Sequence, residues 1–170
     1  MTTDLSIAHI NIRGTGPILT KPQTLINSLH KKHTDIICLT EAKINNKNAN
    51  YYIHNNYITH INRAPNNSSK DGVVTLIRKN LETHIKTHQT VAPGTAKEIK
   101  LHIANRNIDI MCIYAPSHGD DIAIPFFEKH IFSKDWNSEH DNIIIGDFNV
   151  IQDINLDISN PSTGVYIFRF

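Results

Sequence analysis

The polar residues Asp147 and Asn149 follow closely on the apolar run 143–145, from which Gly146 separates them. Three isoleucines in succession predict a strand that is buried on both faces. Open α/β sheets bind their ligands at the carboxyl ends of such strands, so a carboxylate and an amide at this point indicate a site. Asp and Asn also close strands with simple Asx turns. This segment alone does not separate the two interpretations.

Three further polar side chains stand at the ends of other predicted strands. Asn11 ends the first strand, Glu41 follows the second, and Tyr114 ends a later one. One carboxylate with amides and waters is a donor set that suits Mg²⁺, and such an ion can hold a phosphate oxygen and assist the leaving group. A second carboxylate could take a proton from water, and a phenol could donate to a phosphoryl oxygen. Taken singly, each residue is explained better by solvation, packing or a turn.

The elements that must position these side chains are mostly strands. Apolar alternation or short apolar runs predict strands at 5–12, 35–40, 57–62, 72–78, 84–88, 97–104, 108–115 and 142–145. Helical spacing predicts helices at 20–32, with Pro22 in the first turn, and at 122–134. We interpret 41–56 as an irregular surface loop and 105–107 as a hairpin turn. The pattern predicts an α/β protein with two sheets packed face to face and helices outside.

Length and composition restrict the class of protein. The 170 residues fit one domain, and 39% hydrophobic with 19% charged residues is typical of a soluble globular protein. A net charge of +1 gives no bulk signature of a nucleic-acid binder, although a local patch could still bind DNA. No apolar run is long enough for a membrane span, and the first residues do not begin a secretory signal. Cys38 and Cys112 lie in apolar runs, so we expect reduced core thiols of an intracellular protein.

The ordered set of these segments resembles the endonuclease/exonuclease/phosphatase superfamily. The matching segments, which follow the family's order, are 7–14, 35–43, 72–79, 113–117 and 143–150. Within the superfamily, the sequence is most similar to the apurinic-endonuclease-like domain of non-LTR (LINE-type) retrotransposons. The resemblance implies one domain over residues 1–170 with a four-layer α/β sandwich fold, in which helices flank two packed mixed or antiparallel sheets and the carboxyl-terminal part is missing.

The resemblance also implies a role for each polar residue. Asn11 matches an asparagine that supports the metal and water network, and Glu41 matches the glutamate that ligates a divalent ion, Mg²⁺ or alternatively Mn²⁺. Tyr114 matches a tyrosine that contacts the scissile phosphate. Asp147 matches the aspartate that orients or deprotonates the attacking water, and Asn149 matches the phosphate-binding amide beside it. All five are therefore expected catalytic residues, with Glu41 and Asn11 as the metal ligands.

The sequence departs from the family's pattern after Val150. A final Ser-Asp-His-type motif supplies an aspartate and a histidine in the family, whereas residues 151–170 contain no histidine. The segment 138–140 (Ser-Glu-His) precedes Asp147, and we interpret it as a solvated loop. Asp157 matches only weakly a Leu-Asp-Arg motif of retroelement members. We therefore expect a domain that is truncated at its carboxyl end.

The function that the resemblance implies is Mg²⁺-dependent phosphodiester hydrolysis that nicks DNA, impaired by the truncation. DNA is the expected partner, and the expected location is intracellular, or nuclear if chromosomal DNA is the substrate. Nothing in the sequence indicates a membrane or an oligomer. Two alternatives stay open. One is a non-catalytic remnant that binds DNA or metal weakly, and the other is a small-molecule phosphoesterase of the same superfamily, whose additional motifs we do not find.

Overall fold

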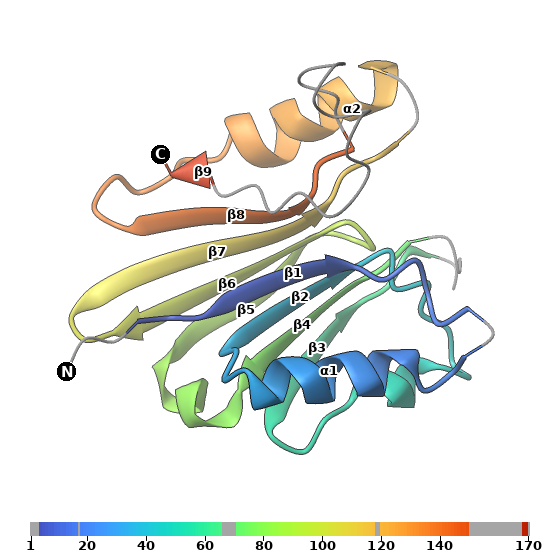
Figure 1. Ribbon diagram of the computed structural model, residues 1–170. Coiled ribbons are helices and arrows are strands. Elements are labelled where there is room, and N and C mark those ends of the chain that lie inside the picture. The colour runs from blue at the N-terminus through green and yellow to red at the C-terminus, as the bar shows by residue number, and fades with distance from the viewer. Residues whose placement is uncertain (1–3, 17, 66–70, 118–119, 150–167, 170) are drawn as a thin grey trace, which may run out of the picture.

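The computed structural model describes residues 4–16, 18–65, 71–117, 120–149 and 168–169, which form two β-sheets packed face to face (Figure 1). Its elements are β1 (Ile7–Asn11), α1 (Lys21–Lys31), β2 (Ile36–Thr40), η1 (Ala49–Tyr52), β3 (Tyr57–Asn62), β4 (Val73–Arg78), η3 (Lys79–His84), β5 (Ile85–Ala92), β6 (Ala96–Ile103), β7 (Arg106–Tyr114), α2 (Asp120–Phe127), η4 (Glu128–Phe132), β8 (Asp141–Asp147) and β9 (Phe168–Arg169). The first sheet has the order β1-β2-β4-β3 and the second β5-β6-β7-β8-β9. The pairs β1–β2 and β7–β8 are parallel and the others antiparallel. The predicted α/β fold with two packed mixed sheets is confirmed.

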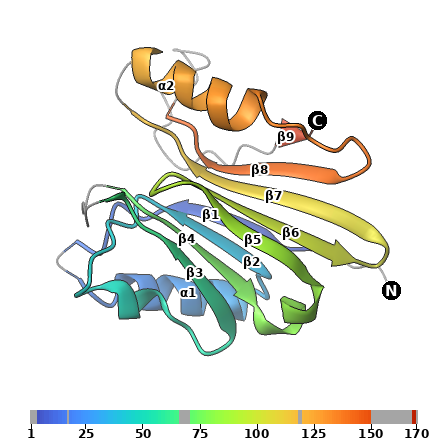
Figure 2. The ribbon, with the colours of Figure 1, turned by 180° about the vertical axis from the view of Figure 1, so that it is seen from behind.

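Apolar side chains fill the spaces between four layers. In the first space, α1 covers the outer face of the first sheet and contributes the fully buried Ile26. In the second, between the sheets, isoleucines of both sheets meet, among them Ile77 and Ile110. In the third, Phe126 and Ile131 of the α2–η4 segment cover the outer face of the second sheet. Figure 2 shows α1 and α2 on opposite outer sides of the two sheets, so the layer order is helix, sheet, sheet, helix.

Both predicted helices form, and the second differs in detail from its prediction. Pro22 lies in the first turn of α1, where its missing N–H costs no hydrogen bond. His30 and Lys31 lie in the last turn, where positive charge complements the helix dipole. The predicted helix 122–134 is divided, because α2 passes at Phe127 into the π-helical turn η4. Pro125, which has no backbone N–H to donate, lies inside α2.

The interpretation of 41–56 as a surface loop is wrong. The side chain of Tyr52 is fully buried, and its hydroxyl donates to the Ala42 carbonyl oxygen at 2.5 Å. Burial raises the pKa of Tyr52 well above its ordinary value. Ala42 and Ile44 are also buried, and Ala49–Tyr52 forms the short 3-10 helix η1. The segment is rich in Asn and Lys, but its few apolar side chains pack on the outer face of the first sheet.

Some strand boundaries of the second sheet differ from their predictions. The strand predicted at 84–88 is β5, which begins at Ile85 and continues to Ala92. The hairpin turn is formed by Ala104 and Asn105, whose φ angles are +50° and +64°, while Arg106 already belongs to β7. Asn commonly adopts this left-handed backbone in turns. The hairpin itself, β6 against β7, is present as predicted.

Asn62 connects the two sheets on the side where β3 and β5 are the edge strands. Its side chain is 3% exposed, and its Nδ2 donates to the carbonyl oxygens of Ala92 and Ala96 at 2.9 and 3.0 Å. Its Oδ1 accepts from Gly94 N at 2.9 Å. A buried amide with its polar groups satisfied fixes orientation without an unpaired-group penalty. Asn62 thus holds the β5–β6 hairpin against the first sheet.

Two other expectations concern burial and the membrane. Cys38 and Cys112 are buried and free, as predicted for core thiols, and burial beside Cys112 raises the pKa of the Cys38 thiol. Among the described residues, no helix has the length and apolar character to cross a membrane.

Asp157 and most of the segment 151–170, on which the expected truncation depends, lie outside the described residues.

Candidate active site

Four of the predicted residues come together where parallel strands of both sheets end. Asn11 ends β1 and Glu41 follows β2, and these two strands pair in parallel in the first sheet. Tyr114 and Asp147 end β7 and β8 and are partners in the parallel register of the second sheet. The sheets face each other, so the four side chains lie at one end of the sandwich. We call these four residues the rim.

A hydrogen bond joins the two halves of the rim. Asn11 Nδ2 donates to Asp147 Oδ2 at 2.5 Å, between residues 136 positions apart in the chain. The Asn11 Oδ1 atom accepts from Arg13 N at 3.0 Å, so the amide is held from its own strand end while it orients the carboxylate of the other sheet. The Asn11 side chain therefore sets the position of Asp147, whether or not it also contacts a metal ion.

The turn after β8 forms both an Asx turn and part of the rim. Asp147 Oδ1 accepts from Asn149 N at 3.1 Å, which is the Asx turn considered from the sequence. Asn149 Nδ2 donates to the Ala115 carbonyl oxygen at 2.7 Å, so the predicted phosphate-binding amide also ties the end of β8 to the end of β7. The two interpretations of this segment are compatible, because the turn orients the carboxylate.

Gly146 is required by the close approach of β7. A Cβ atom at this position would lie 1.9 Å from the Ile113 carbonyl oxygen, and the residue has a φ of +153°. Ile113 and Gly146 are partners in the parallel register. Any side chain at position 146 would push the strands apart just before Asp147.

Left-handed backbone is concentrated at the rim. Arg13, Glu41, Lys43 and Asn149 have φ angles of +51°, +51°, +49° and +49°. Such conformations cost non-glycine residues about 1–3 kcal/mol each, and they persist where the surrounding structure enforces them. Backbone bonds enforce them here: Gly14 N donates to the Glu41 carbonyl oxygen at 2.7 Å. These left-handed residues follow the ends of β1, β2 and β8, where the chain turns beside the polar side chains of the rim.

Glu41 forms an ion pair with Lys43, so a bound cation would compete with Lys43 for the carboxylate. Lys43 Nζ lies 2.8 Å from Glu41 Oε1, with side chains 42% and 20% exposed respectively. The other carboxylate oxygen has no hydrogen-bond or ion-pair partner in the described part of the chain. Lys43 is exposed enough to move aside, so Glu41 can offer one or both oxygens to a bound cation.

Tyr114 is surrounded by negative charge. Burial, followed in order of influence by the negative charges of Glu41, Asp71 and Asp147, raises its pKa to about 12. The phenol is therefore neutral over the physiological pH range and can donate a hydrogen bond to a phosphoryl oxygen. Asp71, which precedes β4, was not singled out from the sequence. The backbone bond from Ala42 N to the Gly72 carbonyl oxygen, at 3.0 Å, shows that this segment lies beside Glu41.

The donors at the rim fit a hard divalent cation that keeps most of its waters. Glu41 supplies a carboxylate, Asn11 an amide oxygen, and Asp71 and Asp147 add negative charge around Tyr114. Oxygen donors with one or two carboxylates are what Mg²⁺ uses in proteins. Within the described residues, no three His, Cys, Asp or Glu side chains converge tightly enough to enclose a metal ion.

His9 is a rim neighbour that the sequence interpretation missed. Its Nε2 lies 2.9 Å from Thr40 Oγ1, and burial lowers its pKa to about 4 despite the opposing influence of Asp147. His9 and Asn11 are two positions apart on β1, and strands place such residues on the same face. That period-two rule, applied to Asn11, would have found it.

The segment 138–140 does not take part in the site. His140 precedes β8, whereas Asp147 ends it, so the two lie at opposite ends of the strand. His140 Nδ1 is 3.2 Å from Asp109 Oδ1, a carboxylate whose side chain is only 4% exposed. The predicted solvated loop is right for Ser138 and Glu139, which are exposed, and wrong for His140, which packs on a buried acid.

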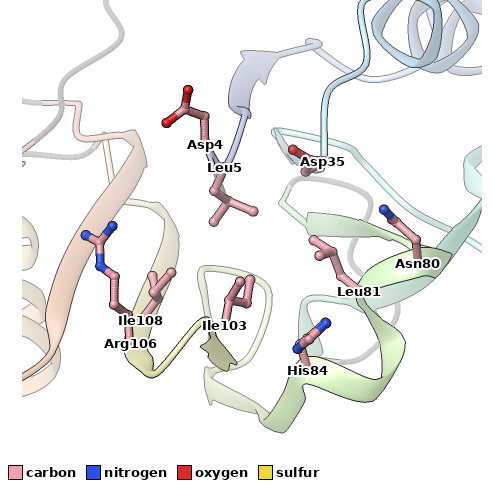
Figure 3. A pocket seen from close by; sticks show the side chains of 9 residues that line it. All are labelled: Asp4, Leu5, Asp35, Asn80, Leu81, His84, Ile103, Arg106 and Ile108. Atoms are coloured by element: carbon pink, nitrogen blue, oxygen red, sulfur yellow. The ribbon is translucent and has the colours of Figure 1, made fainter. Parts of the chain in front are cut away.

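A cavity of about 250 Å³ opens at the other end of the sandwich (Figure 3). Its lining residues are Asp4, Leu5, Asp35, Asn80, Leu81, His84, Ile103, Arg106 and Ile108. They precede β1 and β2, follow β4, and belong to the end of β6 and the start of β7, so they are remote from the rim. We call this region the opposite end.

The chain belongs to the Endonuclease/Exonuclease/phosphatase family, whose model matches residues 8–155. Solved structures support the fold. The AP endonuclease LMAP from Leishmania major is similar with a TM-score of 0.70 at 16% identity, covering 95% of this chain and 59% of that one. The Xenopus laevis APE2 catalytic domain is similar with a TM-score of 0.63 at 16% identity, covering 91% of this chain and 64% of that one.

Danio rerio TDP2, solved with a single-strand DNA product, is similar with a TM-score of 0.63 at 13% identity, covering 87% of this chain and 62% of that one. The chain thus spans about three fifths of the length of these structures. No curated protein sequence matches it. The family model establishes the family of the chain, and the similar structures establish its fold.

Proposed function

We propose that the chain is a Mg²⁺-dependent phosphodiesterase that nicks DNA. The observation that carries the proposal is the hydrogen bond from Asn11 to Asp147, which brings the Glu41 half and the Tyr114 half of the rim together across the two sheets. A carboxylate for a cation, a carboxylate for water and a neutral phenol for phosphate are the groups that hydrolysis of a phosphodiester needs.

Each rim residue has one task in this proposal. Asp147 accepts a proton from the attacking water, and its two oxygens are oriented by Asn11 Nδ2 and Asn149 N. Tyr114 donates its hydroxyl hydrogen to a phosphoryl oxygen. Glu41, with Asn11, holds the cation once Lys43 has moved aside. The bound Mg²⁺, with Mn²⁺ as a substitute, supplies positive charge to the scissile phosphate.

The choice of DNA as substrate rests on the relatives and on the motifs. The similar structures are the AP endonuclease LMAP, the APE2 catalytic domain and a TDP2 in complex with a single-strand DNA product. The motif set 7–150 resembles the nicking domain of LINE-type retrotransposons, and we propose that origin for the chain. A chromosomal target would place it in the nucleus. Because residues 151–170 hold no histidine to pair with the phosphate, we expect slow turnover from the 170-residue chain alone.

Metal binding tests the proposal without relying on turnover. A cation that binds only the folded chain, at ten times its Kd, stabilises it by about 1.4 kcal/mol, which raises the Tm of a domain of this size by about 3–6 °C. Glu41→Gln should abolish the shift with Mg²⁺ or Mn²⁺. Glu82→Gln, the same change on an exposed residue of η3 at the opposite end, should preserve it.

Plasmid nicking then decides between the enzyme and its alternatives. Supercoiled DNA should be converted slowly to open circles in Mg²⁺, and not in EDTA or by Glu41→Gln. A metal-dependent Tm shift without any nicking would favour the non-catalytic remnant. Cleavage of small phosphodiesters with no nicking of DNA would favour the small-molecule phosphoesterase. Nicking that Glu41→Gln does not reduce would contradict the assignment of the rim.

A further inference from the structure

His9 lies between an apolar layer and the rim on the inner face of β1. Ile7, two positions earlier, packs in the core between the sheets, and Asn11, two positions later, reaches Asp147. The cross-strand partner of His9 is Cys38, a fully buried residue. A branched apolar side chain like that of Ile7 would suit this position. The imidazole instead brings polar nitrogens next to the apolar layer between the sheets, which is costly unless they are used.

The imidazole of His9 contacts the end of β2. Its Nε2 is 2.9 Å from the Thr40 hydroxyl, which is itself fully buried. Thr40 immediately precedes Glu41, and its carbonyl oxygen accepts from Ile12 N at 3.1 Å. Two positions further along the same face of β1, Asn11 donates to Asp147 Oδ2. His9 therefore contacts the strand end that presents Glu41, and it lies on the strand that reaches the residue that would activate water.

The hydrogen bond between His9 and Thr40 ties β1 to the end of β2. Which ring nitrogen carries the hydrogen depends on the tautomer, but in either case the ring and the Thr40 hydroxyl form one hydrogen bond. This bond restricts the movement of the last residue of β2, which directly precedes Glu41.

We propose that His9 is a positioning residue that fixes the end of β2, and with it Glu41, relative to Asp147. The proposal rests on the proposed function, because positioning matters only if Glu41 and Asp147 act together. Displacement of a reacting group by about 1 Å can slow an enzyme about 100-fold. A ring hydrogen-bonded to the end of β2 is placed to prevent such a displacement.

The test compares variants that keep and remove the bond. His9→Leu fills the space without a hydrogen bond, and His9→Gln can place an amide near the former Nε2 position. Thr40→Val removes the hydroxyl at constant shape. We expect His9→Leu and Thr40→Val each to lower kcat on a short DNA duplex about tenfold with little change in KM. The double variant should lose no more than either one, and His9→Gln should recover most of the rate.

Ile7→Val is the control for stability at β1. It should lower Tm modestly and leave kcat unchanged, since Ile7 lies one layer below and makes no polar contact with the rim. Affinity for Mn²⁺, measured by electron paramagnetic resonance, gives a second readout that needs no turnover. His9→Leu should weaken it about threefold or more, because Glu41 loses its fixed orientation, while Ile7→Val and His9→Gln should not.

The outcomes distinguish the inference from the proposed function. If wild-type protein cleaves DNA or binds Mn²⁺ and His9→Leu changes neither kcat nor Mn²⁺ affinity, the positioning role is wrong and the function stands. Losses that add in the double variant, or that His9→Gln does not relieve, would also overturn it. If the wild-type protein neither binds Mn²⁺ nor cleaves any phosphodiester, both proposals fail together.

Discussion

The two ends of the sandwich both carry polar residues at strand ends, but these residues are paired differently at the two ends. At the opposite end, charged groups pair with one another: Arg106 Nη2 is 2.7 Å from Asp141 Oδ2, and Asp35 accepts from Ser6 N at 3.0 Å and pairs with Arg78 at 3.6 Å. At the rim, the carboxylates of Glu41 and Asp147, together with that of the neighbouring Asp71, act on the phenol of Tyr114, and Lys43 pairs with Glu41.

We infer from this difference that a cavity is a weaker sign of function in this protein than a group of like-charged side chains without enough opposite charge to pair with them. The opposite end has a cavity of about 250 Å³, but several of its polar side chains are engaged with each other or with backbone. His84 Nδ1, for example, is within 3.0 Å of the His102 carbonyl oxygen. At the rim, the left-handed backbone of Glu41 and Asn149 and the crowding of negative charge are both costly to the fold. Costs of this kind are retained where function requires them.

We expect the largest effect from a substitution that separates β7 from β8 next to the rim. Gly146→Ala places a Cβ where the Ile113 carbonyl oxygen already lies, 1.9 Å away, so β8 must move off β7. We expect a loss of at least about 3 kcal/mol in the free energy of unfolding, in the upper range for single substitutions. Urea denaturation measures it. The same change at Gly16, where nothing lies within 4 Å of an added Cβ, is strained only by its φ of +59° and should cost less.

A smaller change removes only the hydrogen bond between Asn11 and Asp147, which joins the two sheets at the rim. Asn11→Ala deletes the donor to Asp147 Oδ2 and leaves the strands in place. We expect nicking to slow about 10- to 100-fold, because the carboxylate loses its orientation. The free energy of unfolding should fall by only about 1 kcal/mol, as for one hydrogen bond. An unchanged nicking rate would show that this link has no role in the chemistry.

Tyr114 tests the electrostatics of the rim through pH. Its pKa is raised to about 12, so the neutral donor form persists well above the ordinary range and is lost only as the pH approaches 12. The rate should therefore not fall between pH 8 and 10 from ionisation of this phenol. Tyr114→Phe should slow nicking about tenfold with the same profile over that range. A wild-type decline near pH 10 that Tyr114→Phe abolishes would contradict the raised pKa.

The smallest effect is expected at the opposite end. Arg106→Ala removes the ion pair with Asp141, in which the side chains are 62% and 42% exposed. Exposed pairs contribute about 0–1 kcal/mol to stability, so thermal denaturation should change little and nicking not at all. A clear loss of nicking in Arg106→Ala would mean that the opposite end takes part in the function after all.

Much of the rim could be predicted from the sequence because strand patterns are local. Apolar runs locate the ends of β1, β2, β7 and β8, and parallel pairing brings such ends to the same edge. Asn11, Glu41, Tyr114 and Asp147 follow from that reasoning together with the family resemblance. Their placement relative to one another, and the bond between Asn11 and Asp147, required the structure.

The rest depends on contacts between distant segments. The burial of Tyr52 arises from its packing beneath the first sheet, which a segment rich in Asn and Lys does not reveal. Asp71 influences Tyr114 only because β4 lies next to β2. His140 is held by Asp109 of the neighbouring strand, a contact that no local pattern predicts.

A matched pair of variants tests the central claim most directly. Asp147→Asn and Asp4→Asn make the same chemical change, one at the rim and one at the opposite end. We measure the rate at which each, beside the wild-type chain, nicks supercoiled plasmid in Mg²⁺. The account predicts a loss of about 10²–10⁴-fold for Asp147→Asn, as for removal of a general base, and an unchanged rate for Asp4→Asn. Equal rates in the two variants would contradict it.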